Sequence, residues 1–324
     1  MNNSRAHITV RSATDILAIV PTLLAFIPTE SVVAIYLQVS GGRSQLAMTA
    51  RADLPLNHTE SQATLRMLEG HAARYDAMIL VAYSLDTAAA DNALLYYLAN
   101  GESNKVQAAI SATPEGWAEV ESGKPILRHA YPDASSKVTA EIVTAGLAKP
   151  LGGREDLRDS IAAPEKAEAC RFAALVAVSE PMTGEHLAAW LQQWPSADGS
   201  IPTVSRDEAA VLVASVQNIQ TRDTAWAAVS CTDAERHVHL WRQVARLVDG
   251  RPALPVLGLL GMASWIAGQG ALANLVLDRA EQTEGYAGYS LFKLLEEVLR
   301  LGVDPRTWDR LRQAIVAQSG SDRC

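Results

Sequence analysis

The amphipathic pattern of the chain changes near residue 164, and this change limits the folds open to it. Before that point, short apolar runs of strand length alternate with helical periods, whereas after it only helical periods occur. The first pattern is typical of an α/β layer and the second of a helical bundle. We therefore predict an α/β domain over residues 1–163 and an all-helical domain over residues 164–324. A length of 324 residues accommodates two domains of ordinary size.

Two continuous apolar runs predict the interior strands of a small mixed sheet in the first domain. They cover residues 32–37 and 77–83, and neither shows polar alternation, as is typical of strands covered on both faces. Gly41-Gly42 predicts a tight turn, and the alternating segment 45–52 that follows predicts a β-hairpin. Shorter strands are predicted at residues 8–11 and in a small hairpin of residues 117–121 with 126–128.

The second domain is predicted to consist of helices that are separated by short breaks rich in Gly and Pro. The predicted helices are residues 165–178, 185–193, 206–220, 223–229, 233–248, 254–267, 271–282, 290–301 and 305–317. Residues 253–282 have the spacing of half a tetratricopeptide-type helical hairpin, with Trp265 and Gly268 before the turn. A single hairpin cannot bury its own face, so we expect tetratricopeptide-like packing on neighbouring helices and a buried Trp265. A peptide-binding groove is the functional interpretation and ordinary helix packing the structural one, which we favour.

Charge and cysteine usage exclude several classes of function. The net charge is −8, so the chain offers no basic surface for nucleic acid or an anionic membrane. No apolar run has the length and composition of a membrane span, and no cleavage-site pattern follows the first apolar run. Cys170, Cys231 and Cys324 lack metal-site spacing, which favours reduced thiols and a cytoplasmic protein.

The most informative polar group is Thr49, Arg51 and Asp53, because alternation places all three on one face of a strand. The apolar residues predicted on the other face are Leu46, Met48 and Ala50. Ligands of open α/β sheets often bind at the carboxyl ends of strands, where Arg51 could hold an anionic group and Asp53 could orient a donor. The simpler interpretation is an exposed Arg–Asp pair on a polar face, and we favour it.

Catalytic and cofactor motifs are absent from the sequence. No Gly-rich phosphate loop follows a strand, and neither a nucleophile-elbow motif nor a His-Glu-x-x-His motif occurs. His237 and His239 lie two residues apart, and on a helix their side chains point in roughly opposite directions, so they cannot share a metal. We therefore assign no catalytic residue, no metal ligand and no cofactor.

Several segments, taken in order along the chain, resemble an actinobacterial and actinophage family described as domain of unknown function four-one-nine-two. The segments are Ser12-x-x-Asp15-Ile16-Leu17, Val20-Pro21-x-Leu23-Leu24-x-Phe26-x-Pro28-x-x-Ser31-Val32-Val33, Arg51-Ala52-Asp53-Leu54-Pro55, Ile79-Leu80-Val81-x-Tyr83, Arg222-Asp223, Trp265-x-x-Gly268-x-Gly270-Ala271-Leu272-Ala273 and Tyr289-Ser290-Leu291. The resemblance implies no activity. Relatives often carry cysteines before a Pro-x-Gly, where this chain has Thr113-Pro114-Glu115-Gly116, so a thiol or metal role there does not extend to it.

Two hypotheses about function follow. The first is a non-enzymatic binding or protein-interaction protein, whose partner is another protein. The second is a small-ligand-binding protein or enzyme that uses the strand end at Arg51 and Asp53. A cleft with perturbed carboxylates at that strand end would favour the second, and an apolar surface groove in the helical half would favour the first. We favour the first, because the sequence carries no catalytic signature.

Overall fold

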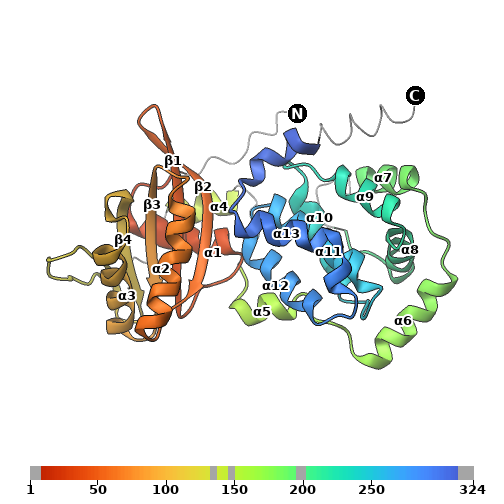
Figure 1. The fold of residues 1–324 in the computed structure, drawn as a ribbon, viewed down its shortest axis with the longest axis horizontal. Helices are drawn as coiled ribbons and strands as arrows, with labels where there is room; N and C mark the ends of the chain where they lie inside the picture. Colours follow the sequence, from red (N-terminus) through yellow and green to blue (C-terminus); the bar gives the residue numbers. More distant parts are fainter. Residues whose placement is uncertain (1–8, 132–136, 145–149, 195–201, 313–324) are drawn as a thin grey trace. The chain divides into compact units, whose positions relative to one another are not determined.

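The computed structural model describes residues 9–131, 137–144, 150–194 and 202–312. The chain forms two compact units, Met1–Asp156 and Leu157–Cys324. The first is a five-stranded mixed sheet with helices, and the second is a run of helices with no strand among its described residues (Figure 1). The predicted fold class is therefore confirmed: an α/β layer comes first and helices follow.

The sheet of the first unit has the strand order β2-β1-β3-β4-β5. The elements of this unit are α1 (Ala13–Leu24), β1 (Ser31–Ser40), β2 (Arg43–Asp53), α2 (His58–Ala72), β3 (Ala77–Tyr83), α3 (Thr87–Asn100), β4 (Val106–Thr113), β5 (Gly116–Glu119) and α4 (Lys137–Thr144). The short helix α5 (Arg154–Asp159) contains the boundary between the two units. β3 and β4 are parallel, whereas β1 runs antiparallel to both β2 and β3. The carboxyl ends of β2, β3 and β4 consequently meet at one edge of the sheet. The predicted runs 32–37 and 77–83 are interior strands, as expected.

Two glycines form the turn of the β1–β2 hairpin, and a bulge sets which side chains of β2 share a face. Gly41 and Gly42 have φ angles of 59° and 73°, and a turn with two positive φ angles requires glycine or a similar residue. The ladder then skips Ala47, an extra residue in β2, and such a bulge reverses the side-chain alternation beyond it. Met48 packs against the sheet core, whereas Leu46 is 43% exposed. The prediction that Leu46 shares the apolar face of Met48 was therefore wrong.

Helices cover both faces of the sheet. Leu68 of α2 and Leu94 of α3 pack with Tyr36 and Leu80 in one buried cluster, and α1 packs against β4 and α4. Ser12 caps α1 by accepting the N–H of Asp15, while the Asp15 carboxylate accepts the N–H of Arg11 at 2.9 Å. This local bond uses the backbone donor that a strand would need.

Two strand predictions failed. Residues 9–11 of the predicted strand 8–11 are irregular because Arg11 belongs to the α1 cap, and residue 8 lies outside the described residues. The hairpin pairs β5 with β4 rather than with residues 126–128, and of the segment that follows β5 only His129 forms a bridge, with Trp117. β4 itself was missed, because its small residues carry little strand signal.

In the second unit the other helices pack around one fully buried helix, α11. The elements are α6 (Lys166–Val178), α7 (Gly184–Gln193), α8 (Arg206–Val216), α9 (Ile219–Ala228), α10 (Ala234–Ala245), α11 (Ala253–Ile266), α12 (Gly270–Glu281) and α13 (Ser290–Arg300). Every residue of α11 is buried, and the helix contacts α8, α9, α10, α12 and α13. A Cβ on Gly258 would lie 2.9 Å from Leu291, so glycine permits the close approach of α13.

The break between the predicted helices 206–220 and 223–229 lies earlier in the chain, at residues 217–218. α8 ends at Val216, and the side chain of Asn218 accepts the N–H of Thr221 as the N-cap of α9. Asparagine favours this capping role over a helix interior, which explains the break. No described helix of the chain combines the length and apolar character that a membrane crossing requires.

Trp265 is 4% exposed, stands edge-on to Trp308, and donates its Nε1–H to the Val303 carbonyl at 3.2 Å. We predict that Trp265→Ala lowers the free energy of unfolding by about 3–5 kcal/mol, because truncating a buried aromatic residue leaves a cavity. Urea denaturation measures this loss of unfolding free energy. Leu294→Ala, at a residue that is 40% exposed, is the control and should cost much less. Equal losses for the two variants would contradict the packing described.

A second prediction concerns pH. Burial lowers the pKa of His237 to about 4, although Asp233 opposes the shift. The folded state then binds fewer protons than the unfolded state between pH 4 and the unfolded value of about 6.5. Stability is therefore present above pH 6.5 and is lost as the pH falls through this window.

The contribution of His237 is at most about 1.4 kcal/mol per pH unit. His71 and His239 have pKa values shifted in the same direction, so the test is a difference between proteins. Denaturation curves from pH 4 to 7 should show a shallower pH dependence for His237→Gln than for the wild type. Parallel curves would mean that His237 titrates normally.

Candidate functional site

Thr49, Arg51 and Asp53 lie on one face of β2, opposite Ile35, Val33 and Ser31 of β1 respectively. Their shared face is as predicted, because the bulge at Ala47 lies before them. Arg51 and Asp53 stand at the sheet edge where the carboxyl ends of β2, β3 and β4 meet. The structure thus brings the three predicted site residues together at the predicted end of the strand.

The guanidinium of Arg51 is bonded within the chain. Its Nε donates to the hydroxyl of buried Ser31 at 2.9 Å, that hydroxyl donates to the Thr29 carbonyl at 2.6 Å, and Nη1 forms an ion pair with Asp53. The Arg51 side chain is 13% exposed and that of Asp53 is 80% exposed. Burial lowers the pKa of Arg51 and the positive charge of Arg154 lowers it further, while Asp53 opposes both. The Arg–Asp pair of the structural interpretation is present, but Arg51 is largely buried rather than exposed.

Other polar residues at this edge, which the sequence did not single out, also bind to one another. The Glu30 carboxylate accepts the Ser84 hydroxyl at 2.9 Å and the N–H of Leu85 at 2.7 Å. Arg128 forms a bidentate pair with Asp91 of α3, at 2.6 and 2.7 Å, with both side chains largely buried. The partners are separated by 37 residues or more, so no sequence spacing could have indicated them. They tie the loops at the strand ends together.

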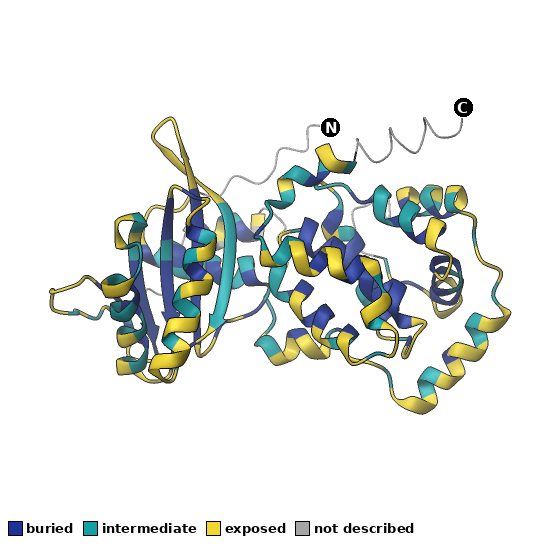
Figure 2. Ribbon diagram, viewed as in Figure 1, coloured by how far each residue is buried: buried dark blue, intermediate teal, exposed yellow. Residues whose placement is uncertain are grey.

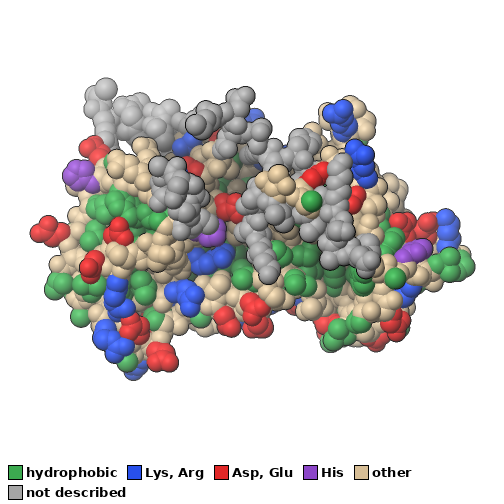
Figure 3. Space-filling view, turned by 180° about the vertical axis from the view of Figure 1, so that it is seen from behind, with side chains coloured by type: hydrophobic (Ala, Val, Ile, Leu, Met, Phe, Trp, Pro, Cys, Tyr) green, Lys and Arg blue, Asp and Glu red, His purple; other side chains and the backbone are tan. Residues whose placement is uncertain are grey.

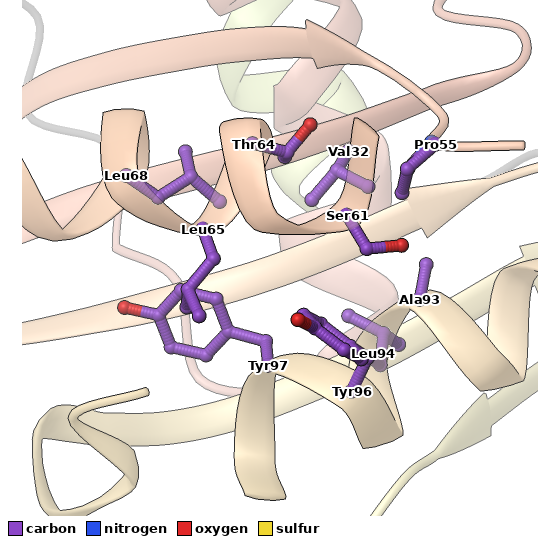
Figure 4. Close-up of a pocket in the computed structure, with 10 residues that line it drawn as sticks. All are labelled: Val32, Pro55, Ser61, Thr64, Leu65, Leu68, Ala93, Leu94, Tyr96 and Tyr97. Carbon is purple, nitrogen blue, oxygen red and sulfur yellow. The ribbon is translucent and has the colours of Figure 1, made fainter. Parts of the chain in front are cut away.

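A small cavity lies between α2 and α3, above the start of β1. Figure 4 shows it; the lining residues are Val32, Pro55, Ser61, Thr64, Leu65, Leu68, Ala93, Leu94, Tyr96 and Tyr97. Its volume is about 10 Å³, close to the smallest space that holds one water molecule. This cavity cannot accept a metabolite.

A larger cavity opens in the second unit, between α6 and the segment that follows α10. Its volume is about 150 Å³. The lining residues are Ala169, Phe172, Ala173, Val176, Ala177, Val248, Asp249 and Pro252. The five from α6 recur at helical spacing and therefore form one apolar stripe. We call this feature the α6 groove.

α6 contributes little to the core of its unit. Of its 13 residues only Phe172 is buried, and Val178 is 78% exposed. Figure 2 shows the contrast between the largely exposed α6 and the buried α11. An apolar helical stripe that the rest of the fold does not cover is the usual mark of an interaction site.

Specific contacts hold the two walls of the α6 groove. On one wall, Arg206 of α8 lies over the ring of Phe172, 5.5 Å from its centroid, and forms an ion pair with Glu168. Hydrogen bonds from Arg171 and then Arg206 lower the pKa of Glu168. On the other wall, Arg279 donates to the carbonyls of Val248 and Ala245 at 2.8 and 2.9 Å.

Arg279 also donates to the carbonyl of Ile161, at 2.5 Å, just before α6. One guanidinium therefore joins the segment that leads into α6 to the opposite wall of the groove. Sequence analysis identified α6 as residues 165–178 but did not identify the groove. An alanine-rich helix gives no clear sign of which face is covered, so no local signal was available.

Metal ligation has no support among the residues that the structure describes, where no group of three or more His, Cys, Asp or Glu side chains could hold an ion. His237 and His239 both lie on α10, and His237 is buried while His239 is partly exposed. Cys170 and Cys231 are reduced, and the thiol of Cys231 donates to the carbonyl of Pro305 at 3.4 Å. On the face that Figure 3 displays, acidic and basic side chains are interspersed rather than gathered by sign.

A comparison with family models matches residues 14–306 to the family described as Domain of unknown function (DUF4192). No curated protein and no solved structure matches the chain. The match covers most of both units and carries no activity with it.

The contacts of the Arg51–Asp53 pair predict that the two residues contribute unequally to the free energy of unfolding. Arg51→Ala should cost about 1–2 kcal/mol of unfolding free energy, because it removes a mostly buried group that bonds to Ser31. Asp53→Ala should cost less than about 1 kcal/mol, because an exposed partner contributes little. Chemical denaturation of both variants measures the difference. A larger loss for Asp53→Ala would contradict the contacts described.

Proposed function

The chain belongs to the family described as Domain of unknown function (DUF4192), and on this premise we propose that it is a non-enzymatic protein-interaction protein. The observation that carries the proposal is the α6 groove, where the rest of the second unit buries Phe172 but leaves the other four stripe residues wholly or partly exposed. The partner is another protein. Such a stripe costs solubility when exposed and is retained where a partner covers it.

The lining of the α6 groove supports binding rather than catalysis. Asp249 is the one charged residue among those that line it, and the others are Ala, Val, Phe and Pro. Catalytic sites bring several polar groups together around the reacting atoms, and the groove has no such convergence. The alternative, a ligand site or enzyme at Arg51, has weaker support because that guanidinium already bonds to Ser31 and Asp53.

The location and source of the protein belong to the same proposal. Reduced Cys170 and Cys231 suit a reducing compartment, so we propose a cytoplasmic protein. The resemblance implies an actinobacterial host or its phage, and the binding experiment is designed for that native cell. Interspersed charges and a net charge of −8 support a protein partner rather than nucleic acid.

Affinity purification from the native cell tests the groove directly. We predict that wild-type protein recovers a partner that Ala173→Glu fails to recover, because a carboxylate in the stripe would have to be desolvated on binding. Quantitative mass spectrometry should show at least about a tenfold loss, corresponding to about 1.4 kcal/mol.

Ala174→Glu is the matched control. Ala173 and Ala174 are adjacent and both exposed, but Ala174 lies outside the stripe, so the two changes have the same effect on charge and helix propensity. The control should retain the partner. Equal recovery by both variants, or equal loss, would remove the support for binding through the groove.

A further inference from the structure

We propose that the α6 groove receives an amphipathic helix of the partner, which inserts one large apolar side chain and places a lysine or arginine one turn further on. This inference rests on the proposed function and specifies the partner's chemistry. Three properties of the groove lead to it: its volume, the shape of its α6 wall and the position of its single charge.

The volume of the groove sets the size of the inserted group. Apolar cavities of about 150 Å³ accept a benzene ring, so a cavity of this volume accepts one side chain of the size of Leu, Met or Phe. Val176 is partly exposed and provides apolar contact surface, whereas Phe172 and Val248 line the cavity but are themselves buried. A single buried anchor of this kind carries much of the binding energy in helix-binding grooves.

The α6 wall has the shape that another helix requires. Ala169, Ala173 and Ala177 recur every four residues along the stripe, a length of about 12 Å or two helical turns. Small side chains at this spacing let a second helix approach closely. A partner helix can therefore lie along α6 with its anchor in the cavity, in the manner of other helix-in-groove complexes.

The charge of Asp249 favours partner helices that carry a basic residue beside the apolar anchor. Asp249 is exposed and lies at the edge of the groove, on the wall that Arg279 holds through the Val248 carbonyl. Burial lowers the pKa of Arg279 and the negative charge of Asp249 opposes that shift, so the two groups already interact, but the guanidinium donates its hydrogen bonds to backbone carbonyls. A basic residue next to the anchor would pair with Asp249 and fix the register of the bound helix.

Selection from a phage-displayed library of helical peptides tests the inference without the native partner. The library presents 16-residue helices with one face randomised, and binders are selected on the full chain and counter-selected on Ala173→Glu. We expect enrichment of Leu, Met, Phe or Trp, followed three or four positions later by Lys or Arg. Repeating the selection on Asp249→Lys should shift the second position to Asp or Glu.

A peptide chosen on the wild type then serves as the probe in direct titrations. We expect it to bind Asp249→Lys at least about tenfold more weakly and Ala174→Glu with unchanged affinity. The inference would be overturned if no peptides were enriched, or if the enriched peptides lacked an apolar anchor. It would also be overturned if selection on Asp249→Lys still enriched the basic residue. Any of these results would contradict the inference about the partner's chemistry without affecting the pull-down from the native cell. If Ala173→Glu recovers the partner as well as the wild type does, the proposed function itself is wrong.

Discussion

Complete burial of α11 is the constraint on which the helical unit depends. An apolar helix without a polar face must be covered on every side, and five helices provide that cover. Glycines at positions 258 and 261 let α13 approach, because side chains there would meet Leu291 and Leu295. The inner faces of α8, α9, α10, α12 and α13 are therefore occupied by folding, and their apolar residues are not available for binding.

α6 stands outside this arrangement. It packs mainly against α8 through Phe172, and Arg279 bonds both to the segment before α6 and to the opposite wall. The groove is thus formed before any partner arrives, which reduces the entropy lost on binding. In the first unit the polar groups at the sheet edge bond to one another, so burial and hydrogen bonding there support the fold.

Sequence patterns predicted the elements whose signal is local. The apolar runs of β1 and β3 and the Gly41-Gly42 turn each follow from a few neighbouring residues. β4 was missed because its small residues resemble those of a helix, and Leu46 was misplaced because a bulge leaves no mark on alternation. The shared face of Thr49, Arg51 and Asp53 was predicted, but the bond from Arg51 to Ser31 depends on strand pairing. The α6 groove is lined by two segments more than 70 positions apart, and no pattern within one helix indicates that they lie together.

We propose that the partly exposed stripe of α6 contacts a protein partner in the cell. Site-specific photo-crosslinking in the native cell tests it most directly, with a photoreactive amino acid placed at Ala173 or, for comparison, at Leu127, which is 70% exposed in the α/β unit. The account predicts a discrete crosslinked protein from position 173 and none of the same mass from position 127. The absence of a product at 173, or the same product at both positions, would contradict it.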